Sequence, residues 1–230
     1  MLRGRLVVAC IPAYNEQDTI VDVVKGAHKH VDIVVVCDDG STDSTYKRAK
    51  AAGAIVIRHP RNMGYGAALR TLFMAAKKLN PDVMITLDGD GQHDPSYIPE
   101  LIRPVLDGHA DIVVGSRMLK ATNIPSYRIL GIKMITWFVR IAAYPTLNDA
   151  QSGFRAYSRR AVQVLDVTER GMGASTEILV KASTYGLRIK EVPIEINYTD
   201  ITPRINPLRH GMSVLLATIK FIARKYLGAL

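Results

Sequence analysis

The feature that most constrains the fold is a regular alternation between short apolar runs and amphipathic segments. The apolar runs are rich in β-branched residues and nearly continuous in apolarity, which is typical of strands buried on both faces. They cover residues 6–11, 33–37, 54–57, 83–87 and 112–114. The segments between them predict helices at 18–29, 44–52, 64–79 and 95–106. This pattern predicts a three-layer α/β fold with a mainly parallel central sheet and right-handed crossovers.

The length and the cysteines fit a single intracellular domain. The chain has 230 residues, 48% of them hydrophobic, enough for one domain or for a domain with an extension. Cys10 and Cys37 lie in apolar runs and match no metal-ligand spacing, so we expect buried, reduced thiols, as in a cytoplasmic protein. No basic and apolar leader opens the sequence, and secretion is not expected.

Polar residues follow each of the first four predicted strands, at 12–16, 38–43, 58–66 and 88–95. The carboxyl ends of parallel strands meet at one edge of the sheet, where α/β proteins bind ligands. We therefore expect the four loops to form a crevice. Helix capping and turn formation explain Asp43 and Asn62 equally well without any ligand.

The fourth of these loops contains Asp88, Gly89, Asp90 and Gln92. Two carboxylates one residue apart at the end of a buried strand form an oxygen-rich set that suits a hard divalent cation. Such a cation can take a diphosphate as its remaining ligands, which indicates chemistry on a nucleotide-activated substrate. An ordinary Asp and Gly turn that ends a strand is the alternative.

The net charge of +9 belongs to the second half of the chain. Residues 120–160 contain seven basic residues and one acid, and residues 201–230 contain five basic residues and no acid. A positive electrostatic potential of this kind attracts nucleic acid, an anionic membrane or a phosphorylated substrate. No nucleic-acid-binding signature accompanies it, so we expect no nucleic-acid partner. The apolar stretch 129–147 is interrupted by Lys133 and Arg140, which favours a helix on a membrane over one through it.

An ordered series of motifs resembles glycosyltransferase family 2, and within it the dolichyl-phosphate (polyprenyl-phosphate) mannose and glucose synthases. The motifs are Pro12-x-Tyr14-Asn15-Glu16, Asp38-Asp39-Gly40-Ser41-x-Asp43, Asn62-x-Gly64-x-Gly66-x-Ala68, Asp88-x-Asp90-x-Gln92-His93-x-Pro95, Gly115-Ser116-Arg117 and Ser152-Gly153-Phe154-Arg155. The resemblance covers about residues 5 to 200 and implies a GT-A fold. It divides the chain into a nucleotide-sugar half (about 1–118), an acceptor half (about 119–200) and a basic helical extension (201–230).

The resemblance also implies roles for individual residues. The nucleoside contacts are Pro12, Tyr14, Glu16, Cys37 and Asp39. Asp88, Gly89, Asp90 and Gln92 correspond to the diphosphate site, in which Asp88, Asp90 and Gln92 hold Mg²⁺ or Mn²⁺. Arg117 resembles an arginine that contacts the donor diphosphate or an acceptor phosphate, and Asp149 is placed to orient a sugar hydroxyl. Arg155 is either structural or directed toward phosphate.

The mechanism depends on the acceptor. A hydroxyl needs a general base, for which Asp149 and Glu177 are the candidates, whereas a lipid monophosphate is already anionic and needs cations instead. The arginines available for that purpose are Arg117, Arg128, Arg204 and Arg209. Segments 126–144 and 211–227 resemble interfacial amphipathic helices, although they can also pack on the domain or on a second subunit of a homo-oligomer.

One departure from the synthases concerns the donor. Tyr198 stands where mannose synthases carry an arginine, and Arg204 stands where they carry a lysine, so the donor remains open between a GDP- and a UDP-hexose. The sequence thus predicts an inverting, metal-dependent transferase, peripheral on the cytoplasmic face of a membrane, that moves a hexose to dolichyl or polyprenyl phosphate. The alternatives are a transferase for a soluble or hydroxyl acceptor and a non-catalytic nucleotide-sugar-binding subunit.

Overall fold

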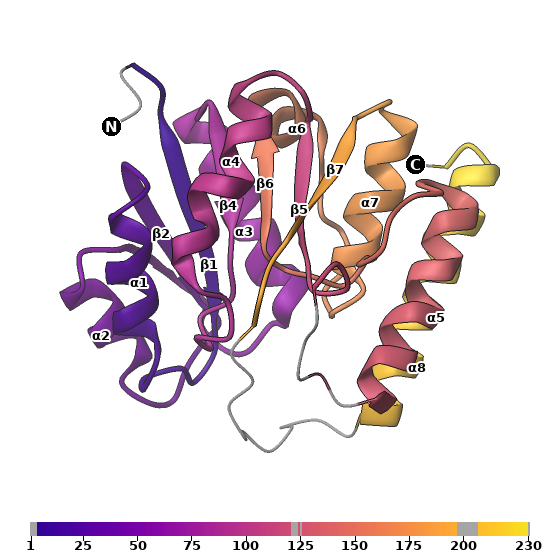
Figure 1. Ribbon diagram of the computed structural model, residues 1–230. Coiled ribbons are helices and arrows are strands. Elements are labelled where there is room, and N and C mark those ends of the chain that lie inside the picture. The colour runs from indigo at the N-terminus through magenta and orange to yellow at the C-terminus, as the bar shows by residue number, and fades with distance from the viewer. Residues whose placement is uncertain (1–3, 121–123, 125, 197–206, 230) are drawn as a thin grey trace.

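A seven-stranded, mostly parallel sheet forms the centre of the protein (Figure 1). The computed structural model describes residues 4–120, 124, 126–196 and 207–229, apart from the side chains of 126–128 and 207–210. The strand order is β3-β2-β1-β4-β6-β5-β7. The strands are β1 (Val7–Ala13), β2 (Ile33–Asp38), β3 (Ile55–Arg58), β4 (Val83–Thr86), β5 (Ile112–Ser116), β6 (Arg155–Ser158) and β7 (Ile189–Pro193).

Helices cover both faces of this sheet, which gives the three predicted layers (Figure 1). On one face lie α1 (Ile20–His28), α2 (Thr45–Ala51) and α4 (Ile98–Leu106), with the 3₁₀ turn η1 (Pro95–Tyr97) before α4. On the other lie α3 (Tyr65–Leu79), α6 (Arg159–Val164) and α7 (Ala174–Thr184). Successive strand residues point to opposite faces, so Ala9 and Cys10 belong to different cores.

Strand β6 was not predicted, and β3 is less buried than predicted. Strand β6 runs antiparallel between β4 and β5, whereas the other neighbouring strands are parallel. Its sequence Arg-Ala-Tyr-Ser is too short and polar to stand out as a buried strand. Strand β3 lies at the sheet edge, where Ile55 is 54% exposed, so it is not buried on both faces.

Helices α5 (Ser126–Ala142) and α8 (Pro207–Tyr226) lie side by side along the flank formed by α7 (Figure 1). Val139 of α5 and Phe221 of α8 are fully buried, which attaches both helices to the body of the protein. The opposite sides of these helices expose a series of large apolar side chains. They are Leu130, Met134, Trp137 and Ile141 on α5 and Met212, Leu216, Ile219 and Tyr226 on α8.

Candidate active site

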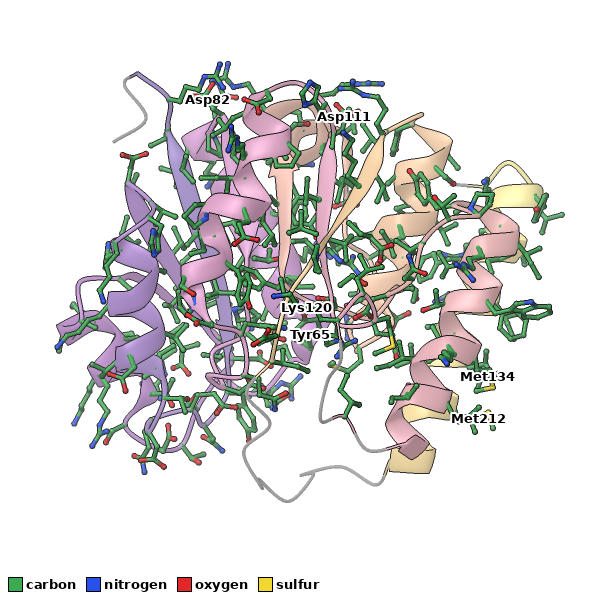
Figure 2. All side chains as sticks on the ribbon, viewed as in Figure 1. Tyr65, Asp82, Asp111, Lys120, Met134 and Met212 are labelled. Atoms are coloured by element: carbon green, nitrogen blue, oxygen red, sulfur yellow. The ribbon has the colours of Figure 1, made fainter. Side chains whose placement is uncertain are left out.

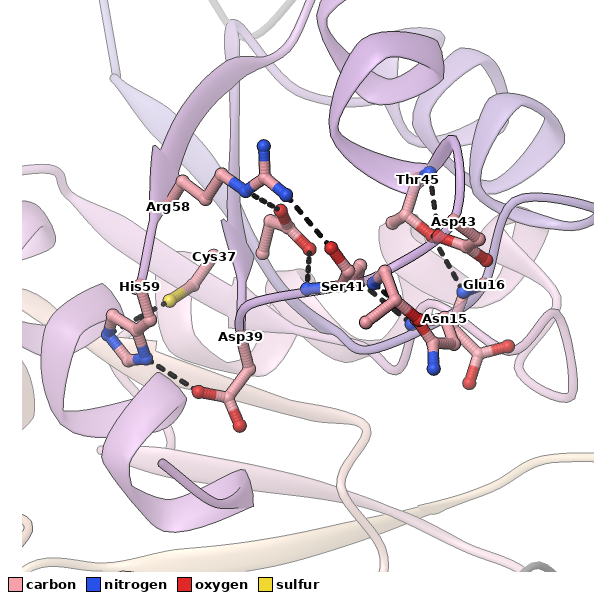
Figure 3. A network of polar contacts seen from close by, with 11 residues as sticks. Asn15, Glu16, Cys37, Asp39, Ser41, Asp43, Thr45, Arg58 and His59 are labelled. Carbon is pink, nitrogen blue, oxygen red and sulfur yellow. Dashed lines mark hydrogen bonds and ion pairs between the residues drawn. The ribbon is translucent and has the colours of Figure 1, made fainter. Parts of the chain in front are cut away.

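The loops after β1 and β2 are hydrogen-bonded to each other at the carboxyl edge of the sheet (Figure 3). Asn15 has a φ of 55°, and its backbone N–H donates to Ser41 Oγ at 2.9 Å. Its side-chain oxygen accepts the Thr42 N–H at 2.9 Å, and the Glu16 N–H donates to Thr45 Oγ1 at 2.8 Å. The first two polar loops therefore form one hydrogen-bonded wall at this edge of the sheet.

Asp39 ties this wall to the loop after β3. Its carboxylate accepts hydrogen bonds from the backbone N–H groups of Met63 and Gly64 at 2.9 and 2.8 Å, and His59 Nδ1 lies 2.6 Å away (Figure 3). Asp39 is only 3% exposed. These contacts give Asp39 a structural role in addition to the predicted one at the nucleoside.

The other predicted nucleoside residues differ in how accessible they are. Pro12 and Cys37 are buried in β1 and β2, and burial raises the pKa of the Cys37 thiol to about 12. Tyr14 is 37% exposed, and Glu16 is partly buried. Tyr14 and Glu16 are therefore accessible to a ligand at this edge, whereas the side chain of Cys37 is enclosed in the core.

The acidic loop after β4 is held close to β1. The Gly89 N–H donates to the Pro12 carbonyl at 3.3 Å, and Thr19 Oγ1 donates to the Gly89 carbonyl at 2.7 Å. A Cβ on Gly89 would lie 3.2 Å from both the Pro12 carbonyl oxygen and the Ala13 Cβ, so the loop packs closely against β1. The two carboxylates of the loop are thereby fixed at the middle of the sheet edge.

Both carboxylates of the acidic loop favour their protonated form more than usual. Burial raises the pKa of Asp88, and burial together with the charge of Asp88 raises the pKa of Asp90. Burial lowers the pKa of the adjacent His93 to about 4. The imidazole is then neutral at pH 7, and its Nδ1 accepts the Asp88 N–H at 3.3 Å.

This donor set fits a hard divalent cation that shares its coordination with a ligand. A cation would relieve the repulsion between Asp88 and Asp90, and Gln92 follows on the same loop with its N–H bonded to Asp90 Oδ1 at 3.0 Å. Within the described part of the chain, no three His, Cys, Asp or Glu side chains gather closely enough to bind a metal by themselves. Further ligands would come from water or from a bound diphosphate.

Arg117 and Asp149 form a buried ion pair at the end of β5. Arg117 Nε and Nη2 donate to the two Asp149 oxygens at 2.6 and 2.8 Å. Burial acts to raise the pKa of Asp149, but the guanidinium outweighs it and holds the pKa below its usual value. Arg117 also lowers the pKa of Asp88 and of His93, so its positive charge acts on the acidic loop.

Comparison with known proteins identifies the family. The glycosyl transferase family 2 model matches residues 8–165. The chain belongs to glycosyltransferase family 2. Its sequence is 33% identical over 222 residues to a UDP-N-acetylglucosamine–dolichyl-phosphate N-acetylglucosaminyltransferase of Methanococcus voltae, covering 86% of this chain and 88% of the relative. It is 30% identical over 213 residues to a dolichyl-phosphate hexose transferase of Haloferax volcanii, covering 90% of each.

A solved structure supports the fold of this family 2 glycosyltransferase. Glucosyl-3-phosphoglycerate synthase of Mycobacterium tuberculosis, solved with Mn²⁺, UDP and glucosyl-3-phosphoglycerate, superposes with a TM-score of 0.76 at 24% identity. The match covers 96% of this chain and 81% of that one. The predicted GT-A architecture and the predicted family are both confirmed.

The glycosyltransferase holds both candidate general bases away from solvent. Asp149 is fully buried and also accepts the N–H groups of Gln151 and Ser152, both at 3.1 Å. Glu177 is fully buried, pairs with Lys181 at 2.8 Å and accepts the Thr168 hydroxyl at 2.6 Å. Both carboxylates are thus paired with a basic side chain, Asp149 with Arg117 and Glu177 with Lys181.

Arg155 is enclosed in the protein, and the remaining predicted cations lie beyond the described side chains. Arg155 is 1% exposed and donates to the carbonyls of Ser175 and Ala150, both at 2.8 Å. Arg204 lies outside the described residues, as do the side chains of Arg128 and Arg209.

Two residues near the acidic loop were missed as site components, His93 and Tyr65. His93 was visible only as the histidine after Gln92 in the motif, with no role attached. Burial raises the pKa of Tyr65, whose hydroxyl lies beside the Asp88 carboxylate next to Gly153 and lowers the pKa of Asp88. No local signal could reveal this contact, because Tyr65 begins α3 and lies 23 positions before Asp88 in the chain.

Proposed function

We propose that this glycosyltransferase moves a hexose from a nucleotide diphosphate sugar to dolichyl phosphate or another polyprenyl phosphate, with inversion at the anomeric carbon. An oxygen of the acceptor phosphate forms the new bond to that carbon while the bond to the nucleoside diphosphate breaks on the opposite side. The names of the relatives from Methanococcus voltae and Haloferax volcanii, both dolichyl-phosphate transferases, support this acceptor. Either a UDP- or a GDP-hexose is a suitable donor.

The state of the two candidate bases carries the proposal. A hydroxyl acceptor requires a base that is accessible and has a suitable pKa. Asp149 is committed to Arg117, and Glu177 to Lys181 and the Thr168 hydroxyl. A phosphate monoester carries negative charge at neutral pH and needs no proton removed, so this arrangement favours a phosphate acceptor over a hydroxyl.

A divalent cation, Mg²⁺ or Mn²⁺, would be held by Asp90 and Asp88 with Gln92 beside them. When bound, it supplies positive charge that stabilises the departing diphosphate. The chain's own contribution is the fixed position of these groups and the positive charge of Arg117. The Asp149 carboxylate orients that guanidinium, whose fork suits phosphate oxygens.

The exposed apolar side chains of α5 and α8 would contact the surface of an anionic membrane, on the cytoplasmic face. Met134 and Met212 point away from the body of the protein (Figure 2), and Trp137 is 55% exposed. Neither helix contains an acidic residue, whereas both contain lysine and arginine, so their charge complements anionic lipids. Among the described residues, no helix has the length and apolarity needed to cross a membrane.

A transfer assay tests the proposed function. The purified protein is incubated with Mn²⁺, a short polyprenyl phosphate and each of several labelled UDP- and GDP-hexoses, and extracted lipid is analysed. We expect a labelled lipid with one donor and none when free polyprenol replaces the phosphate. Transfer to the free alcohol or to a water-soluble acceptor at the same rate would overturn the acceptor assignment. No product with any donor would overturn the function.

Vesicle flotation tests the membrane contact. Wild-type protein should float with vesicles that contain anionic lipid and not with neutral ones, and Trp137→Asp should weaken flotation. Met74→Asp is the matched control, because Met74 is 53% exposed on α3, away from α5 and α8. A protein that forms a dimer through α5 and α8 in sedimentation and ignores vesicles would contradict the membrane contact.

A further inference from the structure

The two oxygens of Asp88 have different surroundings. Oδ1 is buried and has no hydrogen-bond partner among the described residues. The Asp88 side chain as a whole is 30% exposed, and Oδ2 lies 3.6 Å from His93 Nδ1. One oxygen therefore faces the protein interior and the other faces the acidic loop. Buried polar atoms are normally hydrogen-bonded, so the inner oxygen is an exception that calls for an explanation.

The interior side of Asp88 is closed by Gly153 and Tyr65. A Cβ added to Gly153 would lie 2.8 Å from the Tyr65 hydroxyl oxygen and 2.9 and 3.0 Å from the two Asp88 oxygens. The hydroxyl and the carboxylate thus share the space that a side chain at position 153 would fill. A tyrosine hydroxyl is a donor, and a carboxylate accepts, so the two groups are complementary.

Tyr65 has little freedom to move. It is the first residue of α3, and the preceding Gly64 has a φ of 101°. The Gly66 N–H donates to the Arg170 carbonyl at 2.8 Å, and a Cβ on Gly66 would lie 2.0 Å from the Glu169 carbonyl oxygen. The start of α3 is therefore pressed against the loop before α7. The backbone on both sides of Tyr65 is thus held by features that do not involve Asp88.

Arg155 adds a positive charge on the same side of the sheet. It is 1% exposed, both of its Nη groups donate to backbone carbonyls, and its Nε has no partner among the described residues. It also lowers the pKa of Asp88 and of Tyr65. A fixed cation behind a carboxylate favours its ionised form, so Arg155 acts in the same direction as the Tyr65 hydroxyl.

We propose that Tyr65 is a positioning residue that holds Asp88 from the interior side, so that the outer carboxylate oxygen is presented to the cation and diphosphate. This inference rests on the proposed cation site of the acidic loop. Tyr65 itself contacts neither the cation nor the donor. Groups that orient a metal-binding carboxylate typically contribute 10- to 100-fold to metal affinity.

The test compares Tyr65→Phe with Tyr144→Phe. Each variant loses one buried or partly buried hydroxyl, and the Tyr144 hydroxyl donates to the Leu187 carbonyl at 2.8 Å, outside the acidic loop. Mn²⁺ is titrated calorimetrically into protein with UDP, and in a separate series with GDP, and thermal unfolding is recorded in EDTA. We expect Tyr65→Phe to weaken Mn²⁺ binding about 10-fold, and Tyr144→Phe to leave it unchanged.

The outcomes separate this inference from the proposed function. If the wild type shows no cation-dependent nucleotide binding, the proposed function itself is wrong. If the wild type binds Mn²⁺ and Tyr65→Phe binds it equally well, the role of Tyr65 is wrong and the site stands. Gly153→Ala provides a second perturbation, because its methyl group displaces the same pair. Unchanged Mn²⁺ affinity in a folded Gly153→Ala protein would also contradict the inference.

Discussion

Replacing Asp149 by Asn should destabilise the protein strongly without changing its shape. The carboxylate accepts two guanidinium hydrogen bonds from Arg117 and three from backbone N–H groups, while it is 0% exposed. Breaking a buried ion pair by removing one charge costs roughly 3–5 kcal/mol. Asn keeps one oxygen acceptor, and the Arg117 side chain is 15% exposed, so we expect the lower end, about 3 kcal/mol.

Urea unfolding followed by circular dichroism measures this loss, and thermal unfolding should show a midpoint lowered by about 6–12 °C. The pKa of Asp149 is lowered in the folded state, so its contribution is present above the unfolded pKa and is lost as pH falls through the folded one. Asp107→Asn is the control, because it makes the same change in the exposed pair with Arg103. A loss in Asp149→Asn no larger than in this control would refute the reasoning.

Three further predictions concern other parts of the site. Between pH 6.5 and 4, the free energy of unfolding of the wild type should fall by about 3 kcal/mol more than that of His93→Gln. The reason is that His93 gains a proton in the unfolded state, whereas buried His93 in the folded state stays neutral down to about pH 4. A difference between the two proteins that stays constant with pH in urea titrations would contradict this. Glu177→Gln should lower the thermal midpoint but keep kcat per folded molecule within about 3-fold, whereas a hydroxyl-directed base would lose about 10²-fold or more. In Gly40→Ala, the new Cβ would clash with the Arg61 backbone and displace the loop after β3. Calorimetry should therefore show weaker nucleotide binding. An unchanged nucleotide affinity would contradict the arrangement of these loops.

Strands β1, β2, β4 and β5 could be predicted because they are buried on both faces and therefore form continuous apolar runs in the sequence. Strand β6 could not, since it is held by pairing with β4 and β5 and carries the buried Arg155. The antiparallel direction of β6 depends on where the chain returns to the sheet, and a local sequence pattern does not predict that position. Helices α6 and α7 were missed with it.

The position of the candidate site could be predicted from the sequence, but the contacts between its residues could not. Asp88 and Asp90 were located by spacing, and Arg117 by its motif. The ion pair between Arg117 and Asp149 joins residues 32 positions apart, so it cannot be predicted from the sequence. Each residue was therefore interpreted as a separate functional group. The contacts of Asp39 could not be predicted either, because its carboxylate is hydrogen-bonded to His59 and to the loop that follows His59. Burial and long-range pairing decide which predicted groups can act chemically.

The most direct test of the account measures nucleotide binding to wild-type protein and to Asp90→Ala, with Mn²⁺ and with EDTA. Asp94→Ala is the control, since Asp94 caps the turn after the acidic loop through the Ser96 N–H at 2.8 Å. We expect a nucleoside diphosphate to bind wild type and Asp94→Ala far more tightly with Mn²⁺ than with EDTA, and we expect Asp90→Ala to lose this difference. Equal affinity with and without the cation in the wild type, or a full cation effect in Asp90→Ala, would contradict it.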